Sequence, residues 1–196
     1  MKYPDFFNEI PHIILQDELS NFLGSSQEGI IDISYLEIVK MAGHSCAVTS
    51  GSYLMTQIGL KELYGSELPQ RGNIKVEIRE QLTEGNTGVF GSVYSNITGA
   101  TTNTGFGGLG NKFNRRDLMF YGANIRGNVR FTRLDNNDSV ELSYNPHSIV
   151  TPGDIMQSAF GPNATEEAKR TFPEQWQNMV KTIFDNANKV VTIMAL

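Results

Sequence analysis

The single cysteine of this chain, Cys46, lies two residues after one of its three histidines, His44, in the stretch MAGHSCAVTSGSYLM (residues 41–55). Thiolate and imidazole are both good ligands for zinc and other late first-row divalent metals. Gly43 permits a sharp turn that could direct both side chains inward. If a helix begins near Ser45, its free N–H groups and dipole stabilise the Cys46 thiolate. The triplet therefore predicts a metal site.

Two other interpretations of His44-Ser45-Cys46 remain open. Cys46 could be a nucleophile with His44 as its base, although neighbouring turn residues seldom place a base in line with a thiol. Alternatively, the cysteine is buried and structural, beside a hydrogen-bonded histidine. Two ligands do not complete a metal site, so a further ligand is needed. The candidates are His12 or His147, joined by Asp17, Glu37 or Asp154.

A glycine-rich run, GFGGLGN (residues 105–111), follows later in the chain. It lacks the Gly-Lys-Ser/Thr ending of a P-loop, and no βαβ unit surrounds it to support a dinucleotide-binding G-x-G-x-x-G motif. A flexible lid, or a close approach to a neighbouring element, fits the run better. Lys112, Arg115 and Arg116 lie just beyond it and could bind an anionic substrate, or simply form a solvated charged face.

The elements that position these residues follow from hydrophobic periodicity. Residues 47–65 repeat apolar side chains every three to four positions, which predicts a helix with one buried face that ends at Gly65. Small residues in its first two turns would let a ligand or a backbone come close. Residues 15–24 predict a short helix closed by Gly24, and residues 29–41 a strand or short helix that leads into His44.

The remaining elements predict an α+β fold. Alternating apolar residues indicate half-exposed strands at 74–79, 128–135 and 139–145, the last two joined as a hairpin. A capped helix with an apolar stripe follows Thr165. Strands and helices do not alternate regularly, so we expect a single α+β domain over residues 1–196, with a mainly antiparallel twisted sheet packed against helices.

Composition narrows the class of protein. The 196 residues include 16 basic and 21 acidic side chains, for a net charge of −5. The sequence contains no block of basic residues, so we do not expect nucleic acid as a partner. No run approaches the roughly 20 apolar residues of a membrane span, and residues 1–20 do not resemble a signal peptide. One cysteine excludes an intrachain disulfide and a Cys-rich zinc finger. We therefore expect a cytoplasmic protein.

Three segments together resemble the E-subunit family of formylmethanofuran dehydrogenase. That family carries H-G-H-x-C-P-G-x-x-x-G-Y-x-M, then T-G-C-T and G-K-G-N. His44, Cys46, Tyr53 and Met55 match the first motif; Thr98, Gly99 and Thr101 match the second; Gly108, Gly110 and Asn111 match the third. The resemblance covers roughly residues 36–133.

The resemblance implies an α+β core, a homodimer and a metal, commonly zinc, near the His-x-Cys pair. Ala42 and Ala100 replace a histidine and a cysteine of the motifs, and Ala47-Val48 replaces the Pro-Gly. The resemblance therefore implies a divergent, stand-alone member. We expect a metal-binding protein in which an open coordination position faces the Gly-rich loop and suits a small-molecule ligand. The alternative is a non-catalytic, homo-oligomeric assembly protein in which His-Ser-Cys is structural. Whether the protein is an enzyme is left open.

Overall fold

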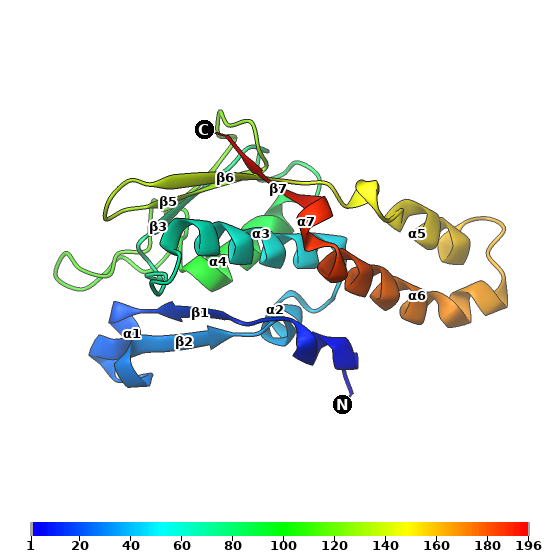
Figure 1. Ribbon diagram of the computed structural model, residues 1–196, viewed down its shortest axis with the longest axis horizontal. Helices are drawn as coiled ribbons and strands as arrows, with labels where there is room; N and C mark the ends of the chain where they lie inside the picture. Colours follow the sequence, from blue (N-terminus) through cyan, green and yellow to red (C-terminus); the bar gives the residue numbers. More distant parts are fainter. Residues whose placement is uncertain (1, 196) are drawn as a thin grey trace.

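The computed structural model describes residues 2–195, and a five-stranded sheet forms one of its layers (Figure 1). Its strand order is β4-β3-β5-β6-β7. β3 (Ile74–Ile78), β5 (Val129–Arg133), β6 (Ser139–Tyr144) and β7 (Val191–Met194) pair antiparallel in that order, whereas β4 (Met119–Tyr121) pairs parallel with β3. The expected α+β fold with a mainly antiparallel sheet is confirmed.

Helices separate this sheet from a second, two-stranded one. α3 (Ala47–Tyr64) and α4 (Thr87–Thr98) lie below the large sheet in Figure 1, and the hairpin of β1 (Ile13–Gln16) and β2 (Ile30–Ile33) lies below them. Tyr53 of α3 connects the helices to this hairpin, because its hydroxyl donates to the carbonyls of Pro11 and Ile33, both at 2.9 Å. The large sheet, the helices and the hairpin thus form three layers. α3 is therefore the central element of the molecule.

The burial of α3 differs from the expected single apolar face. Its contacts include the sheet, α4 and α6, so side chains are buried around most of its circumference. A helix covered on all sides does not need an amphipathic pattern. Small and polar residues therefore occupy core positions in its first half, namely Thr49, Ser50, Gly51 and Ser52.

The other helices frame this centre. Residues 29–41 contribute both predicted alternatives, because β2 is followed by α2 (Tyr35–Ala42). α1 (Glu18–Leu23) ends at Gly24, as predicted, but Asp17 caps its start, and Leu15 and Gln16 of the predicted helix belong to β1. The short 3-10 turns are η1 (Asp5–Glu9), η2 (Gln27–Gly29) and η3 (Pro146–Ser148).

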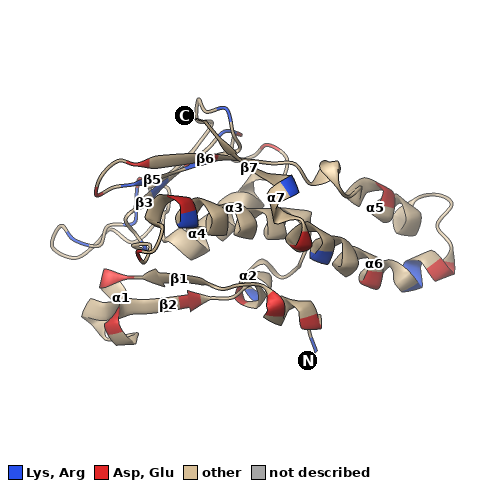
Figure 2. Ribbon diagram, in the orientation of Figure 1, with Lys and Arg blue, Asp and Glu red and all other residues tan. Residues whose placement is uncertain are grey.

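The carboxy-terminal helices form a projecting hairpin. α5 (Pro152–Phe160) packs on α6 (Glu166–Asp185), and both extend beyond the sheet before α7 (Ala187–Val190) leads back to edge strand β7 (Figure 1). Thr165 caps α6 as expected, through its hydroxyl and the Ala168 N–H. Lys and Arg are dispersed among Asp and Glu in this view rather than gathered into a basic face (Figure 2). Among the described residues, no helix is long and apolar enough to cross a membrane.

Candidate metal centre at the start of α3

His44 lies in the tight connection between α2 and α3. Gly43 adopts a left-handed conformation (φ 78°) that ends α2 and turns the chain, as its position before His44 predicted. The exposed imidazole approaches the carbonyl of Ala42, with 3.0 Å between Nδ1 and the oxygen. A carbonyl only accepts, so Nδ1 carries the hydrogen of this bond. In the neutral ring the lone pair then lies on Nε2, which is one of the two ring nitrogens through which histidines bind metals.

Cys46 is the N-cap residue of α3 and is partly exposed. Its backbone N–H donates to the Thr49 hydroxyl at 2.9 Å, and the same hydroxyl lies 3.1 Å from the Cys46 carbonyl. These contacts fix the first turn of the helix. The side chain of Cys46 is thereby held at the N-terminus of α3.

Ser45, between the two candidate ligands, holds this connection to the core. Its buried hydroxyl lies 2.9 Å from the Tyr35 hydroxyl, which in turn lies 3.1 Å from the Thr49 hydroxyl. Burial raises the pKa of Tyr35 to about 12, against the opposing effect of those two hydrogen bonds, so the phenol stays protonated at neutral pH. The indole N–H of Trp176 donates to the Ser45 carbonyl at 3.0 Å. Helices α2 and α6 thus position the segment.

Tyr144, at the end of β6, completes this support. Its hydroxyl donates to the Ala47 carbonyl at 2.7 Å, and its ring lies against Gly51. No sequence pattern indicated a role for Tyr35 or Tyr144, and Trp176 was predicted only as part of the apolar stripe of the helix that follows Thr165. Trp176 is 131 residues from Ser45 in the chain, so no local pattern connects them. The one signal in the sequence is the residue type, because a buried Tyr or Trp usually finds a hydrogen-bond partner for its O–H or N–H group.

The residues predicted as further metal ligands do not lie beside His44 and Cys46. Within residues 2–195, no group of three or more His, Cys, Asp or Glu side chains is arranged to hold a metal ion. His12 pairs with Asp32 across the β1–β2 hairpin, with 2.7 Å between Nδ1 and Oδ1. His147 is exposed on η3. Asp17 binds two arginines, Glu37 caps α2, and Asp154 lies in the first turn of α5.

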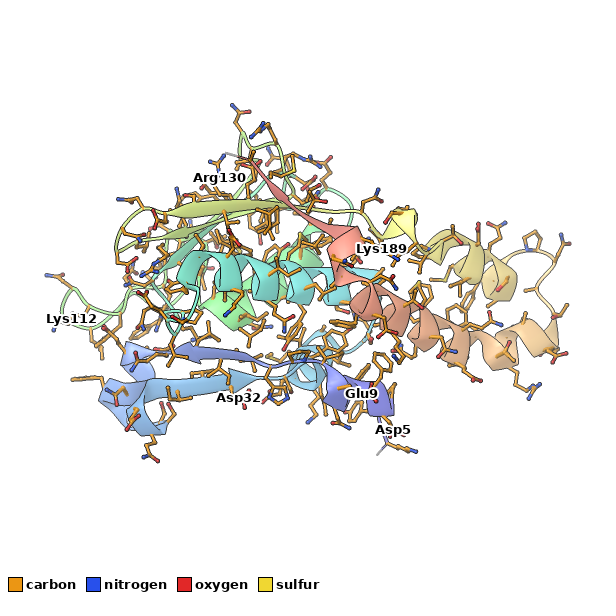
Figure 3. The ribbon with its side chains drawn as sticks, in the orientation of Figure 1. Asp5, Glu9, Asp32, Lys112, Arg130 and Lys189 are labelled. Atoms are coloured by element: carbon orange, nitrogen blue, oxygen red, sulfur yellow. The ribbon has the colours of Figure 1, made fainter. Side chains whose placement is uncertain are left out.

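The glycine-rich loop is also remote from this centre. Phe113 stacks near Phe22 of α1, with 5.5 Å between ring centroids, and Arg115 pairs with Asp17. Figure 3 shows Lys112 at the end of the molecule opposite the α5–α6 hairpin, whereas the start of α3 contacts α6. The open position expected to face this loop is therefore not found in this arrangement.

A metal-free nucleophile receives no support from the contacts. Nδ1 of His44 is hydrogen-bonded to the Ala42 carbonyl. Among the described residues, no hydrogen bond joins His44 to Cys46. The two side chains do flank an inward-directed serine on a segment held by three elements. What this arrangement offers is one free imidazole nitrogen and one free cysteine side chain at a helix N-terminus.

Comparison with known proteins adds no assignment, since no protein-family model, curated protein or solved structure matches this chain. The likeness to the E-subunit family of formylmethanofuran dehydrogenase stays a prediction from the motifs.

Proposed function

We propose that this protein binds a divalent metal ion, zinc in the first instance, through Nε2 of His44 and Sγ of Cys46. The observation that carries the proposal is the hydrogen bond from Nδ1 of His44 to the Ala42 carbonyl. It fixes the tautomer that leaves Nε2 free, as outer hydrogen bonds do for metal-ligating histidines generally. A mixed nitrogen and sulfur donor pair favours zinc over magnesium or calcium.

Two protein ligands leave the remaining positions of a tetrahedral ion to water, to a small molecule or to a second protein. Such openness is typical of metals that act on or carry a ligand, whereas structural zinc sites are closed. The site therefore fits a metal-dependent binding function, with an unidentified small molecule as the exchangeable ligand. A thiolate ligand needs a reducing compartment, and on that ground we propose a cytoplasmic location.

Cobalt(II) titration tests this proposal. We expect one Co²⁺ per chain, with a thiolate-to-cobalt charge-transfer band. Cys46→Ser should abolish the band, and His44→Gln should weaken binding by at least roughly tenfold. His12→Gln and His147→Gln are matched controls, because they remove an exposed histidine elsewhere and should leave the titration unchanged. Stoichiometric binding without the band, or binding that survives Cys46→Ser, would contradict the proposal.

A second candidate function is that of a homo-oligomeric assembly protein. It is favoured by the apolar surface of α5, where Phe160 is 71% and Met156 is 42% exposed on the projecting hairpin. Large exposed apolar residues on a projection are typical of association surfaces. Light scattering should then give a dimer that Phe160→Glu converts to a monomer. A monomeric wild-type protein at all concentrations would exclude this candidate.

A further inference from the structure

A cavity of about 280 Å³ lies far from His44 and Cys46, between α1, the residues before β3 and the end of the Gly-rich loop. Most of the side chains around it are polar. They comprise two arginines, four amides and one carboxylate, namely Arg71, Arg115, Gln70, Asn73, Asn111, Asn114 and Glu18. A cavity of this size is near the lower limit of small-molecule sites, so its occupant would be a small molecule.

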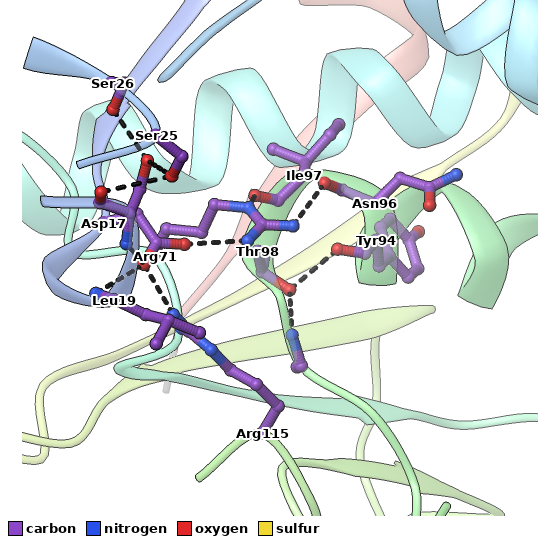
Figure 4. Close-up of polar contacts among 12 residues, drawn as sticks. Asp17, Leu19, Ser25, Ser26, Arg71, Tyr94, Asn96, Ile97, Thr98 and Arg115 are labelled. Carbon is purple, nitrogen blue, oxygen red and sulfur yellow. Dashed lines mark hydrogen bonds and ion pairs between the residues drawn. The ribbon is translucent and has the colours of Figure 1, made fainter. Parts of the chain in front are cut away.

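Arg115 is only 6% exposed, yet most of its hydrogen-bonding capacity is unused. Its Nη2 donates to Oδ1 of Asp17 at 2.6 Å (Figure 4). A guanidinium carries five N–H donors, but among residues 2–195 neither Nε nor Nη1 of Arg115 has an acceptor. Gly72 makes room for this group, because its φ is 85° and a Cβ there would overlap Nη1. A buried arginine with free donors is therefore built into the cavity wall.

Arg71, beside it, donates a hydrogen bond from each of its three guanidinium nitrogens. Its guanidinium donates to Oδ2 of Asp17 at 2.8 Å and to the carbonyls of Ile97 and Asn96 (Figure 4). One buried carboxylate is thus shared by two cations. Burial and the nearby charge of Arg71 lower the pKa of Arg115, against the opposing effect of Asp17. Glu18, the one carboxylate in the lining, is exposed to solvent, where its charge is screened.

We propose that this cavity binds the oxyanion group, carboxylate or phosphate, of a small molecule. The anion would accept hydrogen bonds from the free N–H groups of Arg115 and from the surrounding amides. Arginine suits this role because its planar fork matches both oxyanions. This cavity is where we place the anion expected near Arg115. The arginine is held there by its ion pair with Asp17 and does not lie on an open surface. This inference is independent of the metal proposal.

Titration of the ¹⁵N-labelled protein with sodium acetate and, separately, inorganic phosphate tests the inference, with chloride keeping the ionic strength constant. We expect saturable amide shifts centred on Gly72, Asn73 and Asn114. The anion that produces them identifies the group as carboxylate or phosphate. Absence of saturable shifts with both anions would overturn the proposal, and shifts spread over surface lysines would mean an adventitious ion only.

Two substitutions sharpen the test. Glu18→Gln removes the opposing charge in the lining and should tighten binding roughly two- to fivefold. Glu62→Gln makes the same charge change at an exposed position of α3 outside the cavity lining and should have no effect. Arg115→Gln should abolish saturation, with thermal unfolding as the check on folding. If that variant does not fold, equal affinities of Glu18→Gln and Glu62→Gln would still overturn the proposal.

Discussion

Tyr35 and Tyr94 are equally buried, at 0% and 1% exposure, but their hydroxyls have different partners. The Tyr35 hydroxyl contacts those of Ser45 and Thr49, whereas the one hydrogen-bond partner of the Tyr94 hydroxyl among the described residues is the Met55 sulfur at 3.9 Å. Leaving a buried hydrogen-bond partner unpaired costs about 1–3 kcal/mol. We therefore expect Tyr35→Phe to lower the free energy of unfolding by about 1–2 kcal/mol, and Tyr94→Phe to leave it unchanged or raise it.

Urea unfolding of the two variants measures this difference, with equal m-values as the control for a two-state transition. Tyr35 also supports the connection that carries His44 and Cys46, so Tyr35→Phe should weaken Co²⁺ binding while Tyr94→Phe should not. An equal loss of stability in both variants would show that ring packing, rather than hydrogen bonding, determines the effect.

At the same scale, only part of the candidate site could be predicted from the sequence. His44 and Cys46 are two residues apart, so local chain geometry largely determines their proximity. The residues that hold them, Tyr35, Tyr144 and Trp176, come from three elements and meet only because α3 lies between the sheet and β1–β2. Arg115 was predicted either to bind an anion or to form part of a solvated charged face, and its pairing with Asp17, 98 residues away, could not be predicted from the sequence.

At the scale of elements, two glycines in helices should respond oppositely to alanine. Alanine is favoured over glycine inside a helix by up to about 1 kcal/mol. At Gly51 of α3, however, the added Cβ would overlap the Tyr144 ring, which its hydrogen bond to Ala47 holds in place. At Gly88 of α4 the nearest atom is an ordinary 3.8 Å away. We expect Gly51→Ala to destabilise by about 1–2 kcal/mol and Gly88→Ala to stabilise by about 0.5 kcal/mol.

Chemical denaturation again gives both free energies, and a second-site change identifies the cause. Tyr144→Leu removes the obstructing ring, so Gly51→Ala should cost less in that background than in the wild type. Identical costs in the two backgrounds would mean that α3 and β6 do not press together at Gly51 as the structure describes.

The elements differ in how clearly the sequence pattern predicts them. β3 and the β5–β6 hairpin alternate apolar and polar residues, so their period indicates strands directly. α4 gave no comparable signal, because glycine, serine and threonine fill much of it. Gly91 is needed there, since a Cβ would overlap the Tyr121 hydroxyl of β4. Tertiary packing thus overrides weak helix propensity at this position.

At the scale of the whole molecule, the body and the α5–α6 hairpin should differ in local stability. The end of α6 nearest the body buries Met179, Val180 and Ile183 in the core. α5 packs principally on the other end of α6, outside the three layers (Figure 1). Pro173 lies between these two halves of α6 and lacks the N–H that would continue the ladder of hydrogen bonds. The hairpin should therefore open without unfolding the body.

Native-state hydrogen exchange measures this opening residue by residue. We expect amides of residues 154–172 to exchange at least roughly tenfold faster than those of residues 178–185, because opening the hairpin exposes little of the core. Pro173→Ala restores the missing donor and should slow exchange in the hairpin but not in the body. If a second copy covers Phe160, protection of α5 should also rise with protein concentration, since association stabilises whatever it buries. Uniform protection along α6, independent of concentration, would instead mean that the hairpin and the body unfold as one unit.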